Sequence, residues 1–282
     1  MIFNFNSFSL LENYGVPNFA KKLSSMIISD LFKNKFTSYK LQIDIKEIEN
    51  IKNIDIIVSH IRQDFSSSFR CDASDPFNTM KMEFDVPFNI EENYEYLYEL
   101  ILHELTHLYE FYRIYINGKK LPIYNSIKRG LINTIQQDNI DPFNYFRYIV
   151  YLTLDNELNA RVSQTYIYLK RLKINDEKII LNALEKSSTW NKMSLISKFD
   201  YKKYSKDIIN IIGVDFACVL INEFNKELIN NSLKFSFLKF VNNESDIYSY
   251  FKSWSIRFGY KIKKHKLKLL KLAKEIIKEE NE

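Results

Sequence analysis

The sequence has little cysteine, histidine, glycine or proline. Its 282 residues include two cysteines, four histidines, five glycines and five prolines. The cysteines, Cys71 and Cys218, stand far apart and in no paired-ligand spacing, so the sequence predicts neither a disulfide framework nor a thiolate zinc site. No internal repeat and no Gly/Ser-rich linker divides the chain.

Long apolar runs are also absent. No run approaches 18 apolar residues, so we expect no membrane-spanning helix and no membrane partner. The first six residues, MIFNFN, lack a basic region followed by an apolar stretch, which argues against a secretory signal. We therefore expect a cytoplasmic protein. The alternative is a protein that is virion-associated or delivered by a route without a signal peptide.

Basic residues only slightly outnumber acidic ones. The chain carries 40 Lys and Arg against 35 Asp and Glu, a net charge of +5. Much of the excess lies in the lysine-rich segment 260–274, where apolar residues recur at helical spacing. This pattern predicts the solvated face of a C-terminal helix. The alternative is a contact with nucleic acid; we follow the first interpretation, so nucleic acid is not an expected partner.

The N-terminal part of the chain combines one helical pattern with several strand patterns. A helical stripe over 17–34 is followed by short β-like runs at 41–45 and 54–61. The polar stretch 64–78, which contains Ser66, Ser67 and Ser68, predicts an exposed loop. Apolar and charged residues then alternate over 80–88, and this period of two predicts a sheet with one buried face.

The rest of the chain is helical in pattern. Predicted helices cover 89–116, 123–137 and 141–172, and helices over 176–282 are separated near Ser187, Gly213 and Asn242. The helix that begins at Asp141-Pro142 has an N-cap followed by a first-turn proline. The sequence thus predicts an α+β fold in which a small antiparallel or mixed N-terminal sheet precedes a mostly helical part. We expect a boundary between 1–172 and 173–282, or one continuous domain.

One histidine pair has the spacing of a metal site. His103 and His107 are four residues apart, so on an α-helix both imidazoles project from one face and can bind the same ion. Glu104 lies about 100° further round the helix, where it is poorly placed as a ligand but can reach a water bound to the metal. The pattern His-Glu-x-x-His is typical of zinc peptidases in which the glutamate is the general base.

The helix that carries this motif should be buried. Its apolar residues lie almost all round it; they are Leu97, Leu100, Ile101, Leu102, Leu105, Leu108, Phe111 and Ile114. Burial of a carboxylate and two imidazoles costs several kcal/mol unless each has a partner. A metal ion would supply such a partner. The alternative is a pair of core histidines that hydrogen bonds satisfy.

A third protein ligand is needed if the metal is to keep a position open for water. No histidine follows His107 until His265, so the ligand is sought among the acids. Glu157 stands in mid-helix beside apolar residues such as Leu154 and Leu158, as expected for a ligand on a second packed helix. The alternative is an ion pair of Glu157 with Arg161, one turn later, on an exposed face.

The combination of His103, Glu104 and His107 on one helix with Glu157 on a later helix resembles the gluzincin branch of the zincin metallopeptidases. The resemblance covers residues 79–166. It departs at Arg161, where many gluzincins carry an acid that orients a zinc-bound histidine. The resemblance implies a zincin-like catalytic domain over 1–172, with three zinc ligands (His103, His107 and Glu157) and Glu104 as general base. It also implies an antiparallel edge strand, expected at 79–88, along which an extended substrate binds.

These observations predict a zinc-dependent metallopeptidase, a hydrolase with Zn²⁺ as cofactor and a protein or peptide as substrate. Glu104 would accept a proton as water attacks the peptide carbonyl. The alternative is a structural or binding component of zincin fold, in a phage particle or a delivery assembly, with little or no catalytic turnover.

Other polar residues have less defined roles. Glu99, one turn before His103, is either a hydrogen-bond partner of the site or a solvated helix residue. His60 lies on a β-like run and is expected to be a packed or surface histidine. The donor that stabilises a negatively charged oxygen could be any of several tyrosines, including Tyr109, Tyr112 and Tyr166.

Overall fold

The computed structural model describes residues 16–31, 36–41, 54–61, 66–70, 81–87, 94–116, 142–230, 233 and 235–281. The chain divides into two compact units. The first comprises Met1–Leu121 with Asn159–Leu172, and the second comprises Pro122–Leu158 with Lys173–Glu282. The expected boundary near residue 172 stays a prediction.

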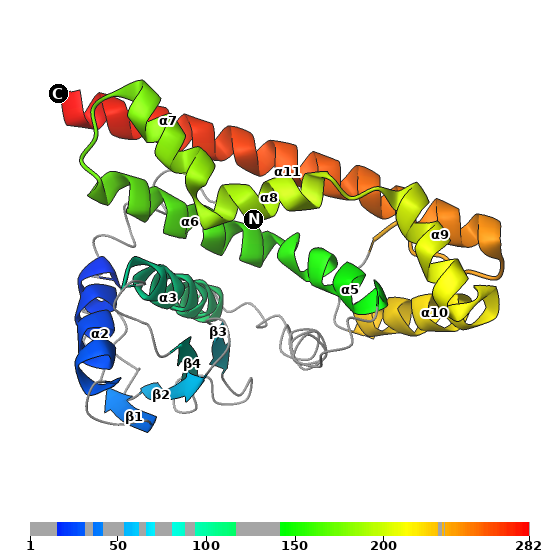
Figure 1. Ribbon diagram of the computed structural model, residues 1–282, viewed down its shortest axis with the longest axis horizontal. Helices are drawn as coiled ribbons and strands as arrows, with labels where there is room; N and C mark the ends of the chain where they lie inside the picture. The colour runs from blue at the N-terminus through cyan, green and yellow to red at the C-terminus, as the bar shows by residue number, and fades with distance from the viewer. Residues whose placement is uncertain are drawn as a thin grey trace. The chain divides into compact units, whose positions relative to one another are not determined.

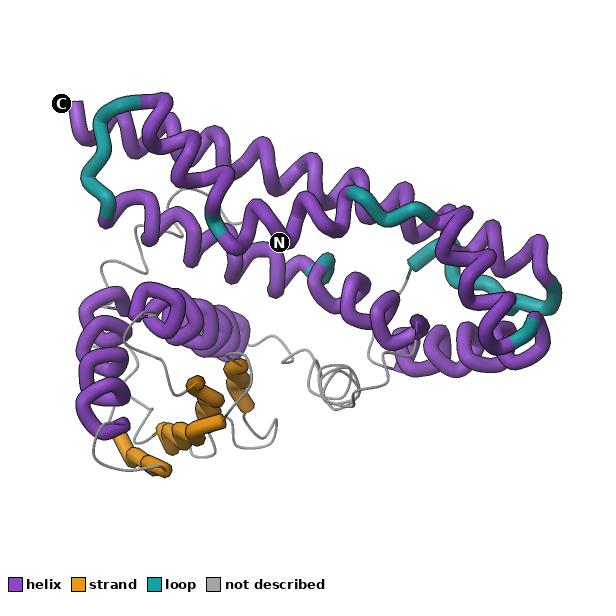
Figure 2. Tube along the Cα trace, in the orientation of Figure 1, coloured by secondary structure: helices purple, strands orange, loops and turns teal. Residues whose placement is uncertain are grey.

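The described strands form one mixed sheet in the first unit. They are β1 (Phe36–Leu41), β2 (Ile54–Ile61), β3 (Ser66–Arg70) and β4 (Lys81–Pro87), in the spatial order β1-β2-β4-β3. β1 pairs with β2 antiparallel, β2 with β4 parallel, and β3 with β4 antiparallel. The described strands all belong to this unit, and helices make up most of the rest (Figure 2). The α+β class and the small mixed sheet near the N-terminus are therefore confirmed.

The buried face of the sheet follows the period-two pattern. On β4, Met82, Phe84 and Val86 are buried, while the charged residues between them are partly exposed. β2 alternates in the same way, and its Ile56 and Val58 stand opposite Met82 and Phe84 in the parallel register. Because successive strand residues point to opposite faces, this register places the apolar side chains of both strands on one face.

Two expectations for this sheet are wrong. Ser66–Arg70 form the strand β3 instead of a loop, and residues 81–87 form an interior strand because β4 lies between β2 and β3. The described edge strand beside β4 is β3 itself. An edge strand has one paired neighbour and tolerates a polar sequence such as SSSFR, which carries no alternating apolar signal.

Two helices of the first unit pack on each other and on the sheet. Helix α2 (Val16–Leu31) contacts α3 (Tyr94–Ile116) and β1, while α3 contacts β3 (Figure 1). On α2, Leu23 and Ile27 are fully buried, as the helical stripe predicted, and Ala20 is fully buried as well. On α3, every residue from 101 to 109 is buried, which confirms that this helix is enclosed on all sides over that stretch.

The second unit is built from helices that pack along one long helix. The bounds are α5 (Pro142–Leu152), α7 (Glu177–Lys186), α8 (Ser188–Ser197), α9 (Tyr201–Ile212), α10 (Val214–Asn230) and α11 (Glu244–Asn281). Helix α11 contacts α7, α8, α9 and α10, and in Figure 1 it runs the length of this unit. The predicted breaks near Ser187, Gly213 and Asn242 are confirmed. None of the described helices is long and apolar enough to cross a bilayer.

The core of the second unit is aromatic. Phe146 on α5 is fully buried and its ring contacts several rings of α9, α10 and α11. The closest partners are Phe251 and Trp254 of α11, at centroid distances of 4.9 and 5.7 Å in edge-on geometry. Such edge-to-face pairs add to the free energy gained by burying the rings.

The long helix expected over 141–172 is interrupted. It consists of α5 and of α6 (Asp155–Arg171), with Thr153 and Leu154 between them. The Thr153 hydroxyl donates to the Val150 carbonyl at 2.8 Å, and the Leu154 amide donates to the Tyr151 carbonyl at 3.1 Å. The helix therefore closes in a turn before α6 begins. No glycine or proline marks this break, so the sequence pattern gives no signal for it.

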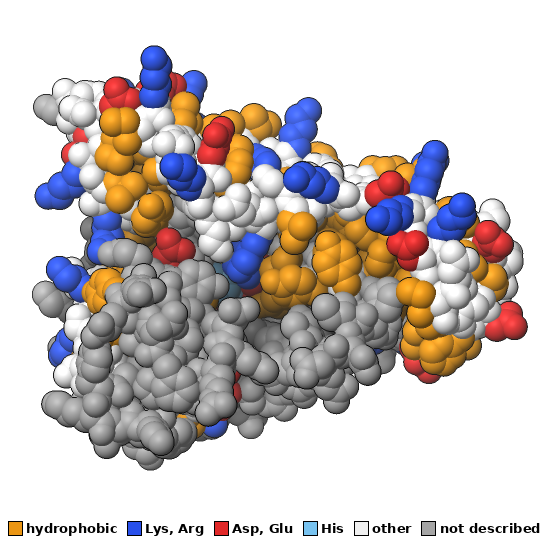
Figure 3. Space-filling view, in the orientation of Figure 1, with side chains coloured by type: hydrophobic (Ala, Val, Ile, Leu, Met, Phe, Trp, Pro, Cys, Tyr) orange, Lys and Arg blue, Asp and Glu red, His pale blue; other side chains and the backbone are white. Residues whose placement is uncertain are grey.

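The lysine-rich segment lies within α11, as predicted. Its lysines do not form one solvated face, because Lys261 is only 8% exposed and forms an ion pair with Asp155. On the face that Figure 3 shows, Lys and Arg side chains are dispersed among apolar and acidic ones and form no single basic patch. The helix expected over 123–137 and the predicted caps at 89–93 and 117–118 lie outside the described residues.

Candidate metal centre

The two histidines of the motif face each other on α3. Their Nε2 atoms lie 3.2 Å apart, and each side chain is 5% exposed. Two ligand nitrogens at about 2.0–2.1 Å from a tetrahedral zinc would be separated by about 3.3 Å. The ring planes are nearly perpendicular, at 85°, with centroids 4.6 Å apart. The one-turn spacing of His103 and His107 thus brings two donor nitrogens together, as the sequence predicted.

Glu157 completes a three-residue cluster. One ligand atom from each of His103, His107 and Glu157 lies within 4.8 Å of the others, and all three side chains are buried. Glu157 belongs to the first turn of α6. The cluster can hold a metal ion.

The burial of Glu157 does not agree with the exposed position that the alternative required. Its side chain is 1% exposed, so it does not lie on a solvent-exposed helix face. Its Oε1 atom accepts a hydrogen bond from the hydroxyl of Tyr151, near the end of α5. Tyr151 was not singled out from the sequence, because six residues separate it from Glu157 and the two would not share a face of an unbroken helix.

Glu104 lies within the same buried stretch as the histidines. It is 1% exposed and follows His103 directly on α3. The neighbouring Thr106 is fully buried and its hydroxyl donates to the Leu102 carbonyl at 2.8 Å. The polar side chains of the motif are therefore enclosed by the fold, and Glu104 is next to His103 in the chain.

Glu99 is a partner of α6 and not a solvated helix residue. Its Oε2 atom accepts a hydrogen bond of 2.9 Å from Nε2 of Gln164. A second contact between the same two helices places the guanidinium of Arg171 over the ring of Tyr98, 4.0 Å from its centroid. These contacts fix α6 against α3 within the first unit. Gln164 is a further residue that the sequence pattern did not identify, since a mid-helix glutamine has no characteristic spacing.

Two of the candidate tyrosines lie in the core. Tyr109 and Tyr166 are buried, at 4% and 1% exposed, whereas the side chains of Tyr112 and His60 lie outside the description. Ser66, Ser67 and Ser68 belong to the edge strand β3. None of these observations selects the donor for a negatively charged oxygen.

The charge nearest to Glu157 along the chain is that of Asp155. Burial raises the pKa of this carboxyl, but a hydrogen bond from Lys261 and the charges of Lys261, His265 and Arg257 outweigh the burial, and the pKa is lowered overall. Asp155 therefore stays ionised as the partner of Lys261 at neutral pH. Both residues belong to the second unit.

Comparison of the chain with protein-family models, with curated proteins and with solved structures gave no match.

Proposed function

We propose that the protein is a zinc-dependent metallopeptidase of gluzincin type, in which His103, His107 and Glu157 hold the metal and Glu104 is the general base. The observation that carries the proposal is the convergence of two imidazole nitrogens and one carboxylate oxygen within 4.8 Å at buried positions. The two nitrogens come from a helix on which a glutamate directly follows the first histidine.

The donor set fits zinc. One class of catalytic zinc site combines two histidines and a glutamate and leaves a further position open, while calcium and magnesium take oxygen ligands almost alone. Two histidines and one carboxylate also hold Fe(II) in oxygenases. Glu104 favours the hydrolytic site, because an oxygenase has no need of a buried carboxylate beside the first ligand. The Nε2 separation of 3.2 Å agrees with a shared tetrahedral ion.

The residues of the proposed site have separate roles in hydrolysis. When bound, zinc supplies an activated water and stabilises negative charge on the substrate carbonyl oxygen. Glu104 takes a proton from the attacking water and passes it to the leaving nitrogen. His103, His107 and Glu157 fix the position of the metal, and the buried surroundings of α3 exclude bulk water, which strengthens these electrostatic interactions. An extended peptide beside β3, the described edge strand next to β4, would place its backbone for strand-like pairing.

Hydrolysis of a mixed peptide library by the zinc-loaded protein tests the proposal. Cleavage should stop on chelation and return with zinc. Glu104→Gln should keep the zinc and lower the rate by about 10²–10⁴-fold, the usual contribution of a general base. Glu227→Gln is the matched control, because this half-buried carboxylate pairs with Arg147 in the second unit, and it should keep the full rate. Bound zinc without any cleavage would instead favour a structural component.

A further inference from the structure

The break between α5 and α6 lies next to Glu157. Tyr151 is in the last turn of α5 and Glu157 is in the first turn of α6. On an unbroken helix, residues six apart differ by about 240° around the axis and cannot touch. The hydrogen bond from the Tyr151 hydroxyl to Glu157 Oε1 therefore depends on the turn at Thr153 and Leu154.

The turn itself is closed by short-range hydrogen bonds. The Thr153 amide donates to the carbonyls of Ile149 and Val150 at 3.2 and 3.1 Å, and its hydroxyl donates to Val150 at 2.8 Å. On the other side of the turn, the Leu158 amide donates to the Leu154 carbonyl at 3.0 Å. These bonds define where α5 stops and α6 starts, and so they set the direction in which the first turn of α6 points.

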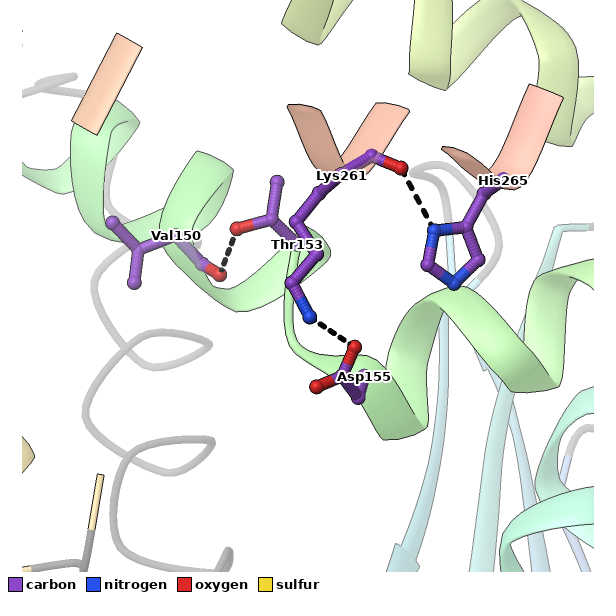
Figure 4. Close-up of polar contacts among 5 residues, drawn as sticks. All are labelled: Val150, Thr153, Asp155, Lys261 and His265. Carbon is purple, nitrogen blue, oxygen red and sulfur yellow. Dashed lines mark hydrogen bonds and ion pairs between the residues drawn. The ribbon is translucent and has the colours of Figure 1, made fainter. Parts of the chain in front are cut away.

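A side chain of α11 holds the start of α6 from outside. The Nζ atom of Lys261 donates a hydrogen bond to Oδ1 of Asp155 (Figure 4). Asp155 is the first residue of α6 and stands two residues before Glu157. One turn further along α11, Nδ1 of His265 donates to the Lys261 carbonyl at 2.8 Å. Lys261 is 8% exposed, and a charge buried to this degree is costly unless it is paired. The Asp155 side chain is 54% exposed, so the pair is buried at its lysine end.

We propose that this junction positions the third metal ligand: Tyr151 orients the Glu157 carboxylate directly, and the Lys261–Asp155 ion pair fixes the helical turn that carries it. The inference rests on the proposed function, because it takes Glu157 as a ligand. Tyr151, Asp155 and Lys261 are positioning residues and not catalytic ones. The ion pair thereby makes the metal affinity depend on α11, which contributes no ligand to the described cluster.

The zinc affinity of the full chain tests the direct contact. Tyr151→Phe removes one hydroxyl and should weaken zinc binding by about 10–100-fold, as for other residues that orient a metal ligand. Zinc alone is the probe, titrated against a coloured chelator. Tyr250→Phe is the matched control, since this buried tyrosine donates to Asn225 Oδ1 at 3.0 Å, within α10 and α11. It should bind zinc like the parent protein.

The thermal midpoints of the metal-free variants separate positioning from a loss of stability. Both tyrosine variants lose one buried hydrogen bond, so a similar fall in midpoint with weakened zinc binding in Tyr151→Phe alone supports the proposal. Equal zinc dissociation constants for Tyr151→Phe and the parent protein would overturn it, and so would an equal loss in both variants. A parent protein that binds no zinc would instead reject the proposed function.

The ion pair has its own test. Lys261→Met keeps the apolar stem of the side chain and removes the charge, and Asp155→Asn removes the opposite charge. Each change should weaken zinc binding. The double variant should bind zinc as tightly as the weaker-binding single variant, because both changes break the same interaction. Additive losses, or no loss in either single variant, would show that this pair does not position Glu157.

Discussion

The Nε2 atoms of His103 and His107 lie 3.2 Å apart in a helical stretch whose residues are all buried. This separation is close to the distance between two nitrogens that share one tetrahedral zinc ion, about 3.3 Å. Glu157, from the first turn of another helix, brings a carboxylate oxygen to the same place.

Glu157→Gln should weaken zinc binding more than any change to a residue that merely orients a ligand, that is, by more than about 100-fold. The amide keeps the shape of the side chain but removes the negative charge that binds the metal. The zinc dissociation constant can be measured by chelator competition. Glu227→Gln, the carboxylate that accepts from Arg147 at 3.0 Å, should keep the affinity of the parent protein. Unchanged affinity in Glu157→Gln would show that the third ligand is another residue.

The metal-binding motif was predictable from the sequence, but the residues that contact and position its helices, such as Tyr151 and Gln164, were not. The i,i+4 spacing of His103 and His107 on an α-helix is local, so it gives the donor pair directly. Glu157 was found by its apolar neighbours in the sequence. Tyr151 was hidden, because its contact needs a break in a pattern that reads as one helix from 141 to 172. Gln164 was hidden because its partner Glu99 is 65 residues away in the chain.

In the sheet, too, local features were predictable from the sequence and long-range ones were not. The apolar alternation on β4 fixed which face is buried, because that pattern is a property of one segment. The order of strands is a property of several segments at once. The serine-rich β3 carries no apolar pattern, so its place at the edge next to β4 became visible only from the pairing.

The two described glycines should respond to alanine with opposite signs. Gly213 caps α9 with φ 78° and ψ 163°, a conformation that residues with a Cβ rarely adopt, so Gly213→Ala should lower the free energy of unfolding by about 1–3 kcal/mol. Gly259 lies within α11, and a Cβ added there would meet open space. Gly259→Ala should therefore raise the free energy of unfolding by about 0.5–1 kcal/mol. Both tryptophans, Trp190 and Trp254, belong to the second unit, so their fluorescence follows urea unfolding there. Shifts of the same sign would contradict this account of the helices.

The aromatic core should contribute much of the free energy of unfolding of the second unit. Phe146→Ala removes a fully buried ring that contacts Phe251 and Trp254, and should cost about 3–5 kcal/mol of the free energy of unfolding. Phe240 is 70% exposed, and Phe240→Ala should change it by less than about 0.5 kcal/mol. Urea unfolding with tryptophan fluorescence compares the two. A cost for Phe146→Ala as small as that for Phe240→Ala would mean that this ring does not lie in the core.

The stability of the second unit should fall in mild acid through His265. Burial lowers the pKa of this imidazole, with Lys268 and Lys261 acting in the same direction and the Lys261 carbonyl and Asp155 opposing. Between the lowered pKa and the ordinary value of about 6.5, the unfolded chain binds a proton that the folded chain does not. His265 therefore does not reduce the free energy of unfolding above about pH 6.5. The free energy of unfolding declines as the pH falls from there towards the lowered pKa.

Urea unfolding at pH 7.5 and pH 5.5 measures this effect. His265→Gln keeps a hydrogen-bond donor and removes the titration, so it should lose less stability between the two pH values than the parent protein does. The other three histidines are present in both proteins, and their contributions cancel in the comparison. Equal losses in the two proteins would show that His265 titrates alike in the folded and unfolded chain.

Metal analysis of the purified protein is the most direct test of a zinc centre built on His103, His107 and Glu157. Under non-chelating conditions we expect about one zinc per chain, lost in His103→Ala and retained in Glu104→Gln, because the first change removes a ligand and the second removes the base. Zinc retained in full by His103→Ala, or a parent protein that binds iron or no metal at all, would contradict a zinc centre built on His103, His107 and Glu157.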